Sequence, residues 1–80
     1  MEREIVKFDL ELDARGMDCP LPILRTKKSL NSMASGQVLR IKATDPGSMR
    51  DFEAFSRQTG HGLLSAENIE DTFVFILKKK

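Results

Sequence analysis

Near its start the chain alternates strictly between apolar and charged residues. Val6, Phe8, Leu10 and Leu12 alternate with Lys7, Asp9, Glu11 and Asp13. A period of two is typical of a β-strand that buries one face. We therefore expect a first strand over residues 6–13, with its apolar side chains packed under the helices.

A helical period follows over residues 20 to about 35, where inward-facing positions recur three or four residues apart. These positions are Ile23, Thr26, Leu30 and Met33. Gly36 can end this helix as a C-terminal cap, and alternation resumes over 37–44, with Leu39 and Ile41 on one side. A strand, a helix and a strand in this order predict a βαβ unit, whose two strands run parallel.

The second half of the chain predicts one more helix and a closing hairpin. Asp45-Pro46 combines a side chain that favours the N-cap with proline at the first helical position, and Gly60 can end this helix. Its buried stripe is Met49, Phe52 and Phe55. We expect strands over 63–67 and 72–78, joined by a turn over 68–71. The last strand is apolar throughout its middle, which favours a central place in the sheet.

The order of elements is therefore βαβαββ, which predicts an α/β (α+β) fold in a single domain over residues 1–80. Two helices on one face of a four-stranded mixed sheet make a two-layer sandwich. The other face, which includes Val38, Arg40 and one set of side chains from 73–77, must then meet water or a partner. Charged side chains such as Lys42 interrupt its apolar positions, so we expect a small patch and a monomer.

The charge balance argues against a polyanionic partner. The 80 residues carry 13 basic and 12 acidic side chains, for a formal net charge of +1. Such a chain has no long-range field to attract nucleic acid or an anionic membrane, and we expect no direct contact with either. The longest apolar run, Phe73 to Leu77, is too short to span a bilayer, and the charged start Met1-Glu2-Arg3-Glu4 lacks the apolar stretch of a signal peptide. These features predict a cytoplasmic protein.

The only cysteine, Cys19, lies directly before a Pro-Leu-Pro sequence. Proline suits the first helical position, so the pattern places Pro20 there and Cys19 at the N-cap. The positive end of a helix stabilises an anion, which predicts a thiol pKa below that of free cysteine. Pro22 disfavours helical geometry at Leu21, and a local departure of this kind is typical of a functional site. The alternative is that Cys19 is a small buried hydrophobic residue.

Other side chains complete or limit this candidate site. A single cysteine excludes an intrachain disulfide and a cysteine-based metal cage, and His61 has no second histidine with which to bind a metal, so we expect no metal or cofactor. Gly16 can adopt the positive φ that directs the chain into the cysteine turn. Arg25, Lys28 and Arg50 could attract an acidic partner or stabilise an anion at Cys19. A solvated helix face explains these cations equally well.

One family signature is matched at each of its fixed positions. The signature is Leu-Asp-x-x-Gly-x-x-Cys-Pro-x-Pro, and the segment is Leu12-Asp13-Ala14-Arg15-Gly16-Met17-Asp18-Cys19-Pro20-Leu21-Pro22. With Asp45-Pro46 followed by Arg50 and Asp51, nearly the whole chain resembles the TusA/SirA family of small sulfur-carrier proteins. The resemblance implies a two-layer sandwich whose cysteine accepts a sulfane sulfur as a persulfide from a cysteine desulfurase or a rhodanese, and hands it on to an acceptor protein. It also implies supporting roles for Asp13, Gly16, Pro20 and Pro22, and a role for Asp45 in partner recognition.

Two functions fit these residues. The leading hypothesis is a sulfurtransferase-type carrier in which Cys19 cycles between thiol and persulfide, in a relay such as transfer RNA thiolation or sulfur oxidation. A carrier needs an exposed thiol and no second cysteine nearby, because a resolving thiol would discharge the persulfide. The alternative is a non-catalytic protein-binding or regulatory module in which Cys19 is incidental. Exposure of the Cys19 sulfur distinguishes the two.

Overall fold

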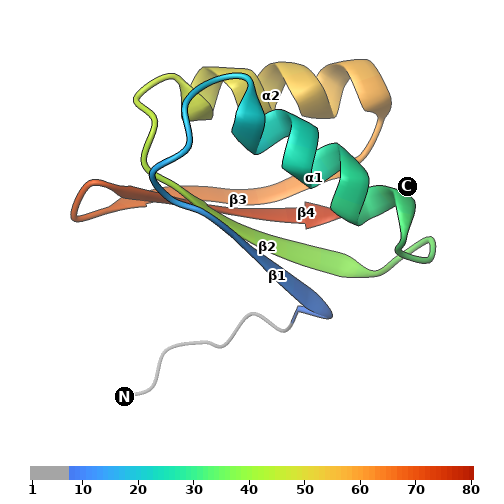
Figure 1. The fold of residues 1–80 in the computed structure, drawn as a ribbon. Coiled ribbons are helices and arrows are strands. Elements are labelled where there is room, and N and C mark those ends of the chain that lie inside the picture. The colour runs from blue at the N-terminus through green and yellow to red at the C-terminus, as the bar shows by residue number, and fades with distance from the viewer. Residues whose placement is uncertain (1–7) are drawn as a thin grey trace.

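The structure, a computed structural model, describes residues 8–80. Its elements in chain order are β1 (Leu10–Ala14), α1 (Leu21–Asn31), β2 (Val38–Ala43), α2 (Ser48–Thr59), β3 (Gly62–Ile69) and β4 (Thr72–Lys78) (Figure 1). The predicted order βαβαββ is confirmed. Val6 and Lys7, which the alternation places in the first strand, lie outside the described residues.

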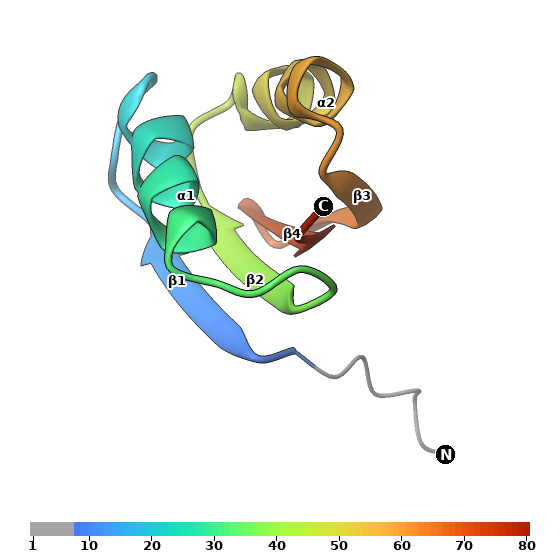
Figure 2. The same ribbon diagram turned by 90° about the vertical axis from the view of Figure 1, so that its right-hand side faces the viewer.

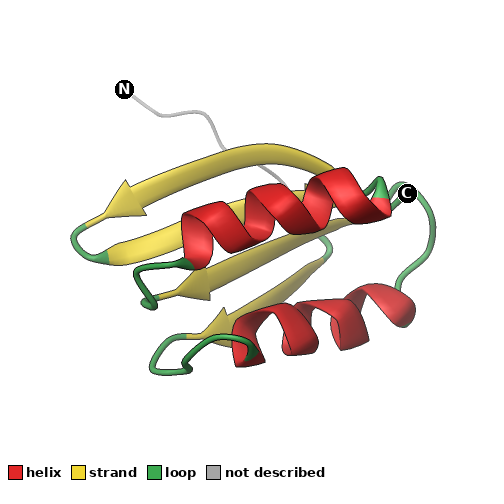
Figure 3. Cartoon of the chain, turned by 90° about the horizontal axis from the view of Figure 1, so that it is seen from above, coloured by secondary structure: helices red, strands yellow, loops and turns green. Residues whose placement is uncertain are grey.

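The strands form one mixed sheet in the order β1-β2-β4-β3. β1 pairs with β2 in parallel, as the βαβ unit predicts, with Leu12 opposite Ile41. β4 pairs antiparallel with both β2 and β3, so the most apolar strand is central, as predicted. Both helices cover the same face of the sheet (Figure 2) and lie side by side over it (Figure 3). The predicted two-layer sandwich is therefore confirmed.

The core lies between the sheet and the two helices. Its largest fully buried apolar side chains are Leu30, Leu39, Ile41, Phe52, Phe75 and Leu77. The Phe52 ring of α2 stacks on the Phe75 ring of β4, with centroids 4.3 Å apart, and aromatic pairs of this kind stabilise beyond their buried area. Thr26 on α1 and Met33, which follows this helix, are also buried. The helical period of the sequence therefore identified the correct faces of both helices.

Two side chains predicted to lie under the helices are exposed instead. Phe8 and Leu10 each keep 41% of their surface exposed. β1 is an edge strand that begins only at Leu10, so Phe8 does not continue its alternation. The Phe8 ring lies 5.6 Å from Cζ of Arg40, a residue that alternates with the buried Leu39 and Ile41 and so faces away from the helices.

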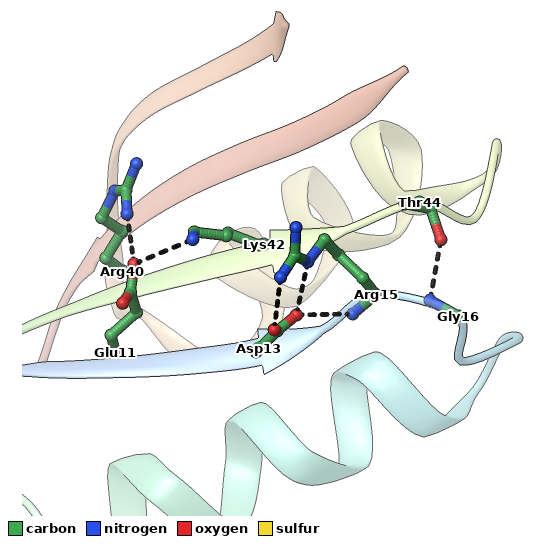
Figure 4. A network of polar contacts seen from close by, with 7 residues as sticks. All are labelled: Glu11, Asp13, Arg15, Gly16, Arg40, Lys42 and Thr44. Carbon is green, nitrogen blue, oxygen red and sulfur yellow. Dashed lines mark hydrogen bonds and ion pairs between the residues drawn. The ribbon is translucent and has the colours of Figure 1, made fainter. Parts of the chain in front are cut away.

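The face of the sheet away from the helices is less open than predicted. Val74 and Ile76 lie on it, but they are only 9% and 4% exposed. Their neighbours on β2 are Lys42 and Arg40, whose aliphatic stems can cover apolar surface. Both cations also form ion pairs with Glu11 of β1 (Figure 4). The prediction that one set of β4 side chains must meet water or a partner is therefore wrong.

Two boundaries differ from the sequence pattern. α1 ends earlier than predicted, with Ser32 as its C-cap, and Gly36 lies in the following turn, where its N–H donates to the Lys79 carbonyl at 2.9 Å. The closing hairpin is tighter than predicted, because its turn consists of Glu70 and Asp71 alone, with φ of 48° and 70°. Two-residue turns with positive φ usually contain asparagine or glycine. Because Glu70-Asp71 contains neither, the sequence did not indicate a turn of this length.

Candidate functional site

Cys19 lies in the loop between β1 and α1, at the end of the sheet where the parallel strands β1 and β2 both finish. Figure 1 shows the course of this loop from β1 to α1. Its thiol is free and the residue is exposed. The chain reverses in a four-residue turn in which the Leu21 N–H donates to the Asp18 carbonyl at 2.8 Å. The Cys19–Pro20 peptide bond in this turn is cis. The exposure of Cys19 excludes its reading as a buried hydrophobic residue.

The structure corrects the predicted place of Cys19 relative to the helix. α1 begins at Leu21 and its N-cap is Pro20, so Pro22 occupies the second helical position and Cys19 precedes the helix. The N–H of Leu21 bonds to the Asp18 carbonyl and is therefore not available to the sulfur. The N-cap prediction for Cys19 is wrong by one residue, and with it the argument that the helix end stabilises a thiolate.

The charges that act on the thiol are acidic. The pKa of Cys19 is raised, first by a side-chain hydrogen bond with Asp51, then by desolvation, and then by the negative charges of Asp51 and Asp45. Each of these effects disfavours the thiolate. The prediction of a lowered thiol pKa is therefore wrong, because Asp51, desolvation and Asp45 raise this pKa instead, and the two carboxylates flank the start of α2.

Asp45 and Asp51 flank the start of α2. This helix begins at Ser48 with Gly47 as its N-cap, so the prediction of Asp45 as the N-cap is also wrong. Asp45 Oδ2 instead accepts the Gly47 N–H at 3.0 Å, and its carbonyl accepts the Ser48 N–H at 3.0 Å. A Cβ at position 47 would lie 3.2 Å from Asp45 Oδ2 and 3.8 Å from Asp51 Oδ2. Both carboxylates therefore border the space that a side chain at position 47 would enter.

Polar contacts fix the Cys19 loop to the end of the sheet (Figure 4). Asp13, near the end of β1, forms a bidentate ion pair with Arg15, with Nε to Oδ1 at 2.9 Å and Nη2 to Oδ2 at 2.8 Å. The hydrogen bonds from Arg15 hold the pKa of the Asp13 carboxyl well below its usual range. Gly16 has the predicted positive φ, 82°, and its N–H donates to Thr44 Oγ1 at 2.9 Å. This last contact joins the Cys19 loop to the loop that carries Asp45.

The candidate docking cations do not gather around Cys19. Arg25 is exposed near the middle of α1, and Lys28 is exposed in its last turn. At the rise of an α-helix, Lys28 lies about 10 Å along the axis from the start of α1. Arg50 is exposed in the first turn of α2, beside Asp51. Arg50 and Asp45 thus share the Cys19 end of the molecule, whereas Lys28 does not.

His61 takes part in the packing of the chain end. Its ring stacks on Phe55 with centroids 5.9 Å apart, and its Nδ1 accepts the Lys80 N–H at 3.0 Å. Desolvation, followed by the charges of Lys79 and Lys80, lowers the pKa of His61. Within residues 8–80, no three His, Cys, Asp or Glu side chains come together as metal ligands. No helix in the same range is long and apolar enough to cross a membrane.

Sequence reasoning missed two apolar side chains at the Cys19 end. Leu21 and Leu24 are 47% and 53% exposed at the start of α1. Their three-residue spacing, away from the buried stripe, was a signal that the sequence did contain. Asp51 and Thr44 were not recognised as neighbours of the Cys19 loop, because these contacts join two separate loops and no local pattern reports them.

Known proteins resemble the chain along nearly its whole length. The family model described as Sulfurtransferase TusA matches residues 10–79. The chain is 58% identical over 72 residues to the sulfur carrier protein TusA of Allochromatium vinosum, covering 90% of the chain and 95% of the relative. It is 38% identical over 72 residues to TusA of Pseudomonas entomophila, covering 90% of each. The crystal structure of a SirA-like protein from Desulfitobacterium hafniense has the same fold, with a TM-score of 0.78 at 19% identity over 88% of this chain and 96% of that one. The chain therefore belongs to the TusA family of sulfur-carrier proteins.

Proposed function

We propose that the chain carries sulfur as a persulfide on Cys19, which it accepts from a donor protein and passes to an acceptor protein. The observation that carries this proposal is the free, exposed thiol in the turn between β1 and α1. A binding module would tolerate a buried Cys19, whereas a carrier requires this exposure. Membership of a sulfur-carrier family supports the same function.

The transfer conserves atoms and electrons. The Cys19 sulfur attacks the terminal sulfur of a donor persulfide, R–S–SH. The donor S–S bond breaks as the new bond to Cys19 forms, and the leaving donor sulfur takes up a proton as R–SH. The proton that Cys19 gives up passes to water, which also supplies the proton that the leaving donor sulfur takes up. The transferred sulfur keeps its oxidation state, so the step needs no external oxidant or reductant.

The same chemistry explains why one cysteine suffices. A second thiol near Cys19 would attack the persulfide, form an internal disulfide and release the cargo as sulfide. The sequence contains a single cysteine, so the loaded chain has no internal route to this loss. The sulfur then leaves only when a thiol from outside reaches it.

We infer that partners dock at the Cys19 end of the molecule. The exposed Leu21 and Leu24 offer apolar contact area beside the thiol, and Arg50 and Asp45 provide charges on the α2 side. Arg25 lies within reach of a partner that covers the start of α1, and Lys28 only of one that follows α1 to its end. The donor is a cysteine desulfurase or a rhodanese, and the relay serves transfer RNA thiolation or sulfur oxidation.

Radioactive sulfur tests the proposal. The chain is incubated with a cysteine desulfurase and labelled cysteine, and separately with a loaded rhodanese, and is then separated without reductant. We expect label on the wild-type chain, its removal by dithiothreitol, and none on Cys19→Ser. A wild-type chain that stays unlabelled with both donors, or a Cys19→Ser chain that is labelled equally, would overturn the proposal.

A further inference from the structure

The register of the sheet places the β3–β4 turn at the same end of the molecule as Cys19. Ala14 at the end of β1 lies opposite Ala43 of β2. On the other side of β2, Ala43 lies opposite Phe73 of β4, which in turn lies opposite Asn68 of β3. The Cys19 loop, the β2–α2 loop and the β3–β4 turn all lie beyond this row of residues, and Figure 3 shows the three connections at one end of the sheet.

The β3–β4 turn is close enough to Cys19 to be covered by the same partner. Strands in a sheet are about 4.8 Å apart, and three strand spacings separate β1 from β3, so the turn lies about 10–15 Å across the sheet from the Cys19 loop. A specific interface covers about 800 Å² of each protein, which is a patch about 30 Å across. A partner centred on the thiol therefore extends over the turn.

Exposed apolar side chains lie on both sides of this end. Leu21 and Leu24 are exposed at the start of α1, and Ile69, the last residue of β3, is 51% exposed. A single exposed isoleucine is ordinary on a protein surface. Ile69, however, lies at the end that a sulfur partner must cover to reach Cys19, where it offers apolar contact area across the sheet from the two leucines.

The two sides of this end carry charges of opposite sign. The exposed cations of α1 are Arg25, Lys27 and Lys28, and this helix contains no acidic residue. The β3–β4 turn consists of Glu70 and Asp71, which are both exposed. Within residues 8–80, neither carboxylate forms an ion pair. Their charges can therefore attract basic side chains of a partner.

The backbone of the turn does not explain why its two residues are acidic. Glu70 and Asp71 have φ of 48° and 70°, and asparagine and glycine are the most favourable residues in a two-residue turn of this kind. An Asn-Gly sequence would build the same turn with less strain. The acidic side chains are therefore better explained by contact with a partner than by the needs of the fold.

We propose that Ile69, Glu70 and Asp71 form a second contact surface for the proteins that exchange sulfur with Cys19. This surface fits a partner that carries basic side chains and an apolar contact about 10–15 Å from its own reactive sulfur. The basic face of α1 and the acidic turn together determine the orientation of the partner, because a reversed partner would bring like charges together. This role rests on the proposed sulfur-carrier function.

A change of the turn to Asn-Gly separates docking from folding. Glu70→Asn/Asp71→Gly suits the positive φ values and should raise the unfolding temperature while it removes both charges. We expect the KM for sulfur loading by a cysteine desulfurase or a loaded rhodanese to rise about threefold to tenfold at unchanged kcat. Ile69→Ala should raise the same KM about twofold to fivefold, because the partner loses apolar contact.

The matched control removes a charge from another exposed surface. Glu53 is exposed in the middle of α2, and Glu53→Gln should keep the wild-type KM. A folded Glu70→Asn/Asp71→Gly chain with an unchanged KM for every donor that loads wild type would overturn the proposal. An equal rise of the KM in Glu53→Gln would also overturn it, because the effect would then come from the overall charge of the chain.

Short peptides test the charge of the turn without a sulfur donor. Two peptides carry a pyridyl disulfide at one end and, after five glycine and serine residues, either two lysines or two glutamates. Five extended residues span about 17 Å, which reaches from Cys19 to the turn. The Cys19 thiolate attacks the sulfur of the peptide, the pyridyl disulfide bond breaks and pyridinethione leaves, so each rate is read by absorbance.

The ratio of the two rates reports whether the turn attracts basic groups. We expect the lysine-to-glutamate ratio to fall about twofold or more in Glu70→Asn/Asp71→Gly and to stay at the wild-type value in Glu53→Gln. A ratio that is equal in the turn variant and wild type would overturn the proposal. If neither donor loads wild type, the proposed function fails, while the peptide ratio still decides whether the turn attracts basic groups beside Cys19.

A second copy of the chain is the other occupant that opposite charges at one end could attract. Sedimentation equilibrium at the concentrations of the loading assay distinguishes the two, and we expect wild type to be a monomer. A wild-type dimer that dissociates in Glu70→Asn/Asp71→Gly would assign the turn to self-association and overturn the proposal.

Discussion

The turns that lead into the two helices begin alike, with a polar side chain followed by proline, and use that side chain in opposite ways. In the second turn, Asp45 accepts the N–H of Gly47 and so holds the turn together. In the first, the backbone closes the turn through the Leu21 N–H, and Thr44 anchors the loop from outside it. The Cys19 side chain is not needed to build its turn. A turn that is held by other groups can present its own side chain for chemistry.

The largest expected effects come from replacing Cys19 and Asp45 separately and measuring sulfur loading and the free energy of unfolding for each variant. Cys19→Ser should abolish sulfur loading and change the free energy of unfolding by less than about 0.5 kcal/mol, because the residue is exposed. Asp45→Ala should lower the free energy of unfolding by about 1 kcal/mol, because the Gly47 N–H loses its acceptor, and should leave a Cys19 thiol that still reacts with iodoacetamide. Urea denaturation and labelling measure the two effects. Equal destabilisation by both substitutions would mean that Cys19 also builds its turn.

Pro22 and Pro46, which lie next to the two turns, should differ in how much they contribute to the free energy of unfolding. Pro22 is buried on α1, so Pro22→Ala removes packed methylene groups and should lower the free energy of unfolding by about 1–2 kcal/mol. It should also slow sulfur transfer, because the start of α1 supports the Cys19 turn. Pro46 is exposed, and Pro46→Ala should cost less than about 1 kcal/mol. Thermal unfolding that ranks Pro46→Ala as the more damaging change would contradict this comparison.

The hydrogen bond from the Gly16 N–H to Thr44 Oγ1, which joins the two loops, should contribute less to the free energy of unfolding than the contacts within either turn. Thr44→Val keeps the shape of the side chain but removes the acceptor of the Gly16 N–H, and should cost about 0.5–1 kcal/mol. Hydrogen exchange at Gly16 should become faster and sulfur transfer a few times slower, since the loop loses its external anchor. Thr44→Ser retains the hydroxyl and should retain both properties. Unchanged protection at Gly16 in Thr44→Val would show that this contact does not anchor the loop.

The smallest expected effect is a shift in thiol acidity. The side-chain hydrogen bond with Asp51, desolvation and the charges of Asp51 and Asp45 raise the pKa of Cys19. Cys19 therefore holds its proton to a higher pH than a cysteine in an unstructured peptide, and its reaction with iodoacetamide should reach half its maximal rate at a higher pH. Asp45→Asn keeps an oxygen for the Gly47 N–H and removes the charge, and should lower this midpoint. A wild-type midpoint at or below that of the peptide would contradict the acidic surroundings of the thiol.

The fold could be predicted because its signals are local. The period of two around Leu39 and Ile41, the helical stripe through Phe52, and the apolar middle of β4 each require only neighbouring residues to be read. The start of the first strand was predicted too early, since Phe8 continues the alternation in the sequence but precedes β1, which begins at Leu10. An edge strand has few partners that fix where it begins, so pattern alone could not place its boundary.

Within the candidate site, only Cys19 and the loop that carries it could be predicted from the sequence. The position of Cys19 before the prolines predicted a presented thiol, and Cys19 is indeed free and exposed; Gly16 was assigned its positive φ correctly. The proline pattern placed the start of α1 one residue too early, and the raised pKa of Cys19 has causes that this pattern does not report, namely Asp51, desolvation and Asp45. Asp51, which raises the pKa of Cys19, comes from the other helix, and its effect depends on how two loops pack. No periodicity reports such packing, and the surroundings of the thiol were therefore mistaken for basic ones.

The most direct test of the central claim, that Cys19 itself carries the sulfur, is the mass of the intact chain after incubation with a cysteine desulfurase and cysteine. Fragmentation then locates any added mass. We predict the gain of a single sulfur atom on the fragment that contains Cys19, its loss on reduction, and no gain in Cys19→Ser. A folded wild-type chain whose Cys19 reacts with iodoacetamide but never gains sulfur would contradict the account.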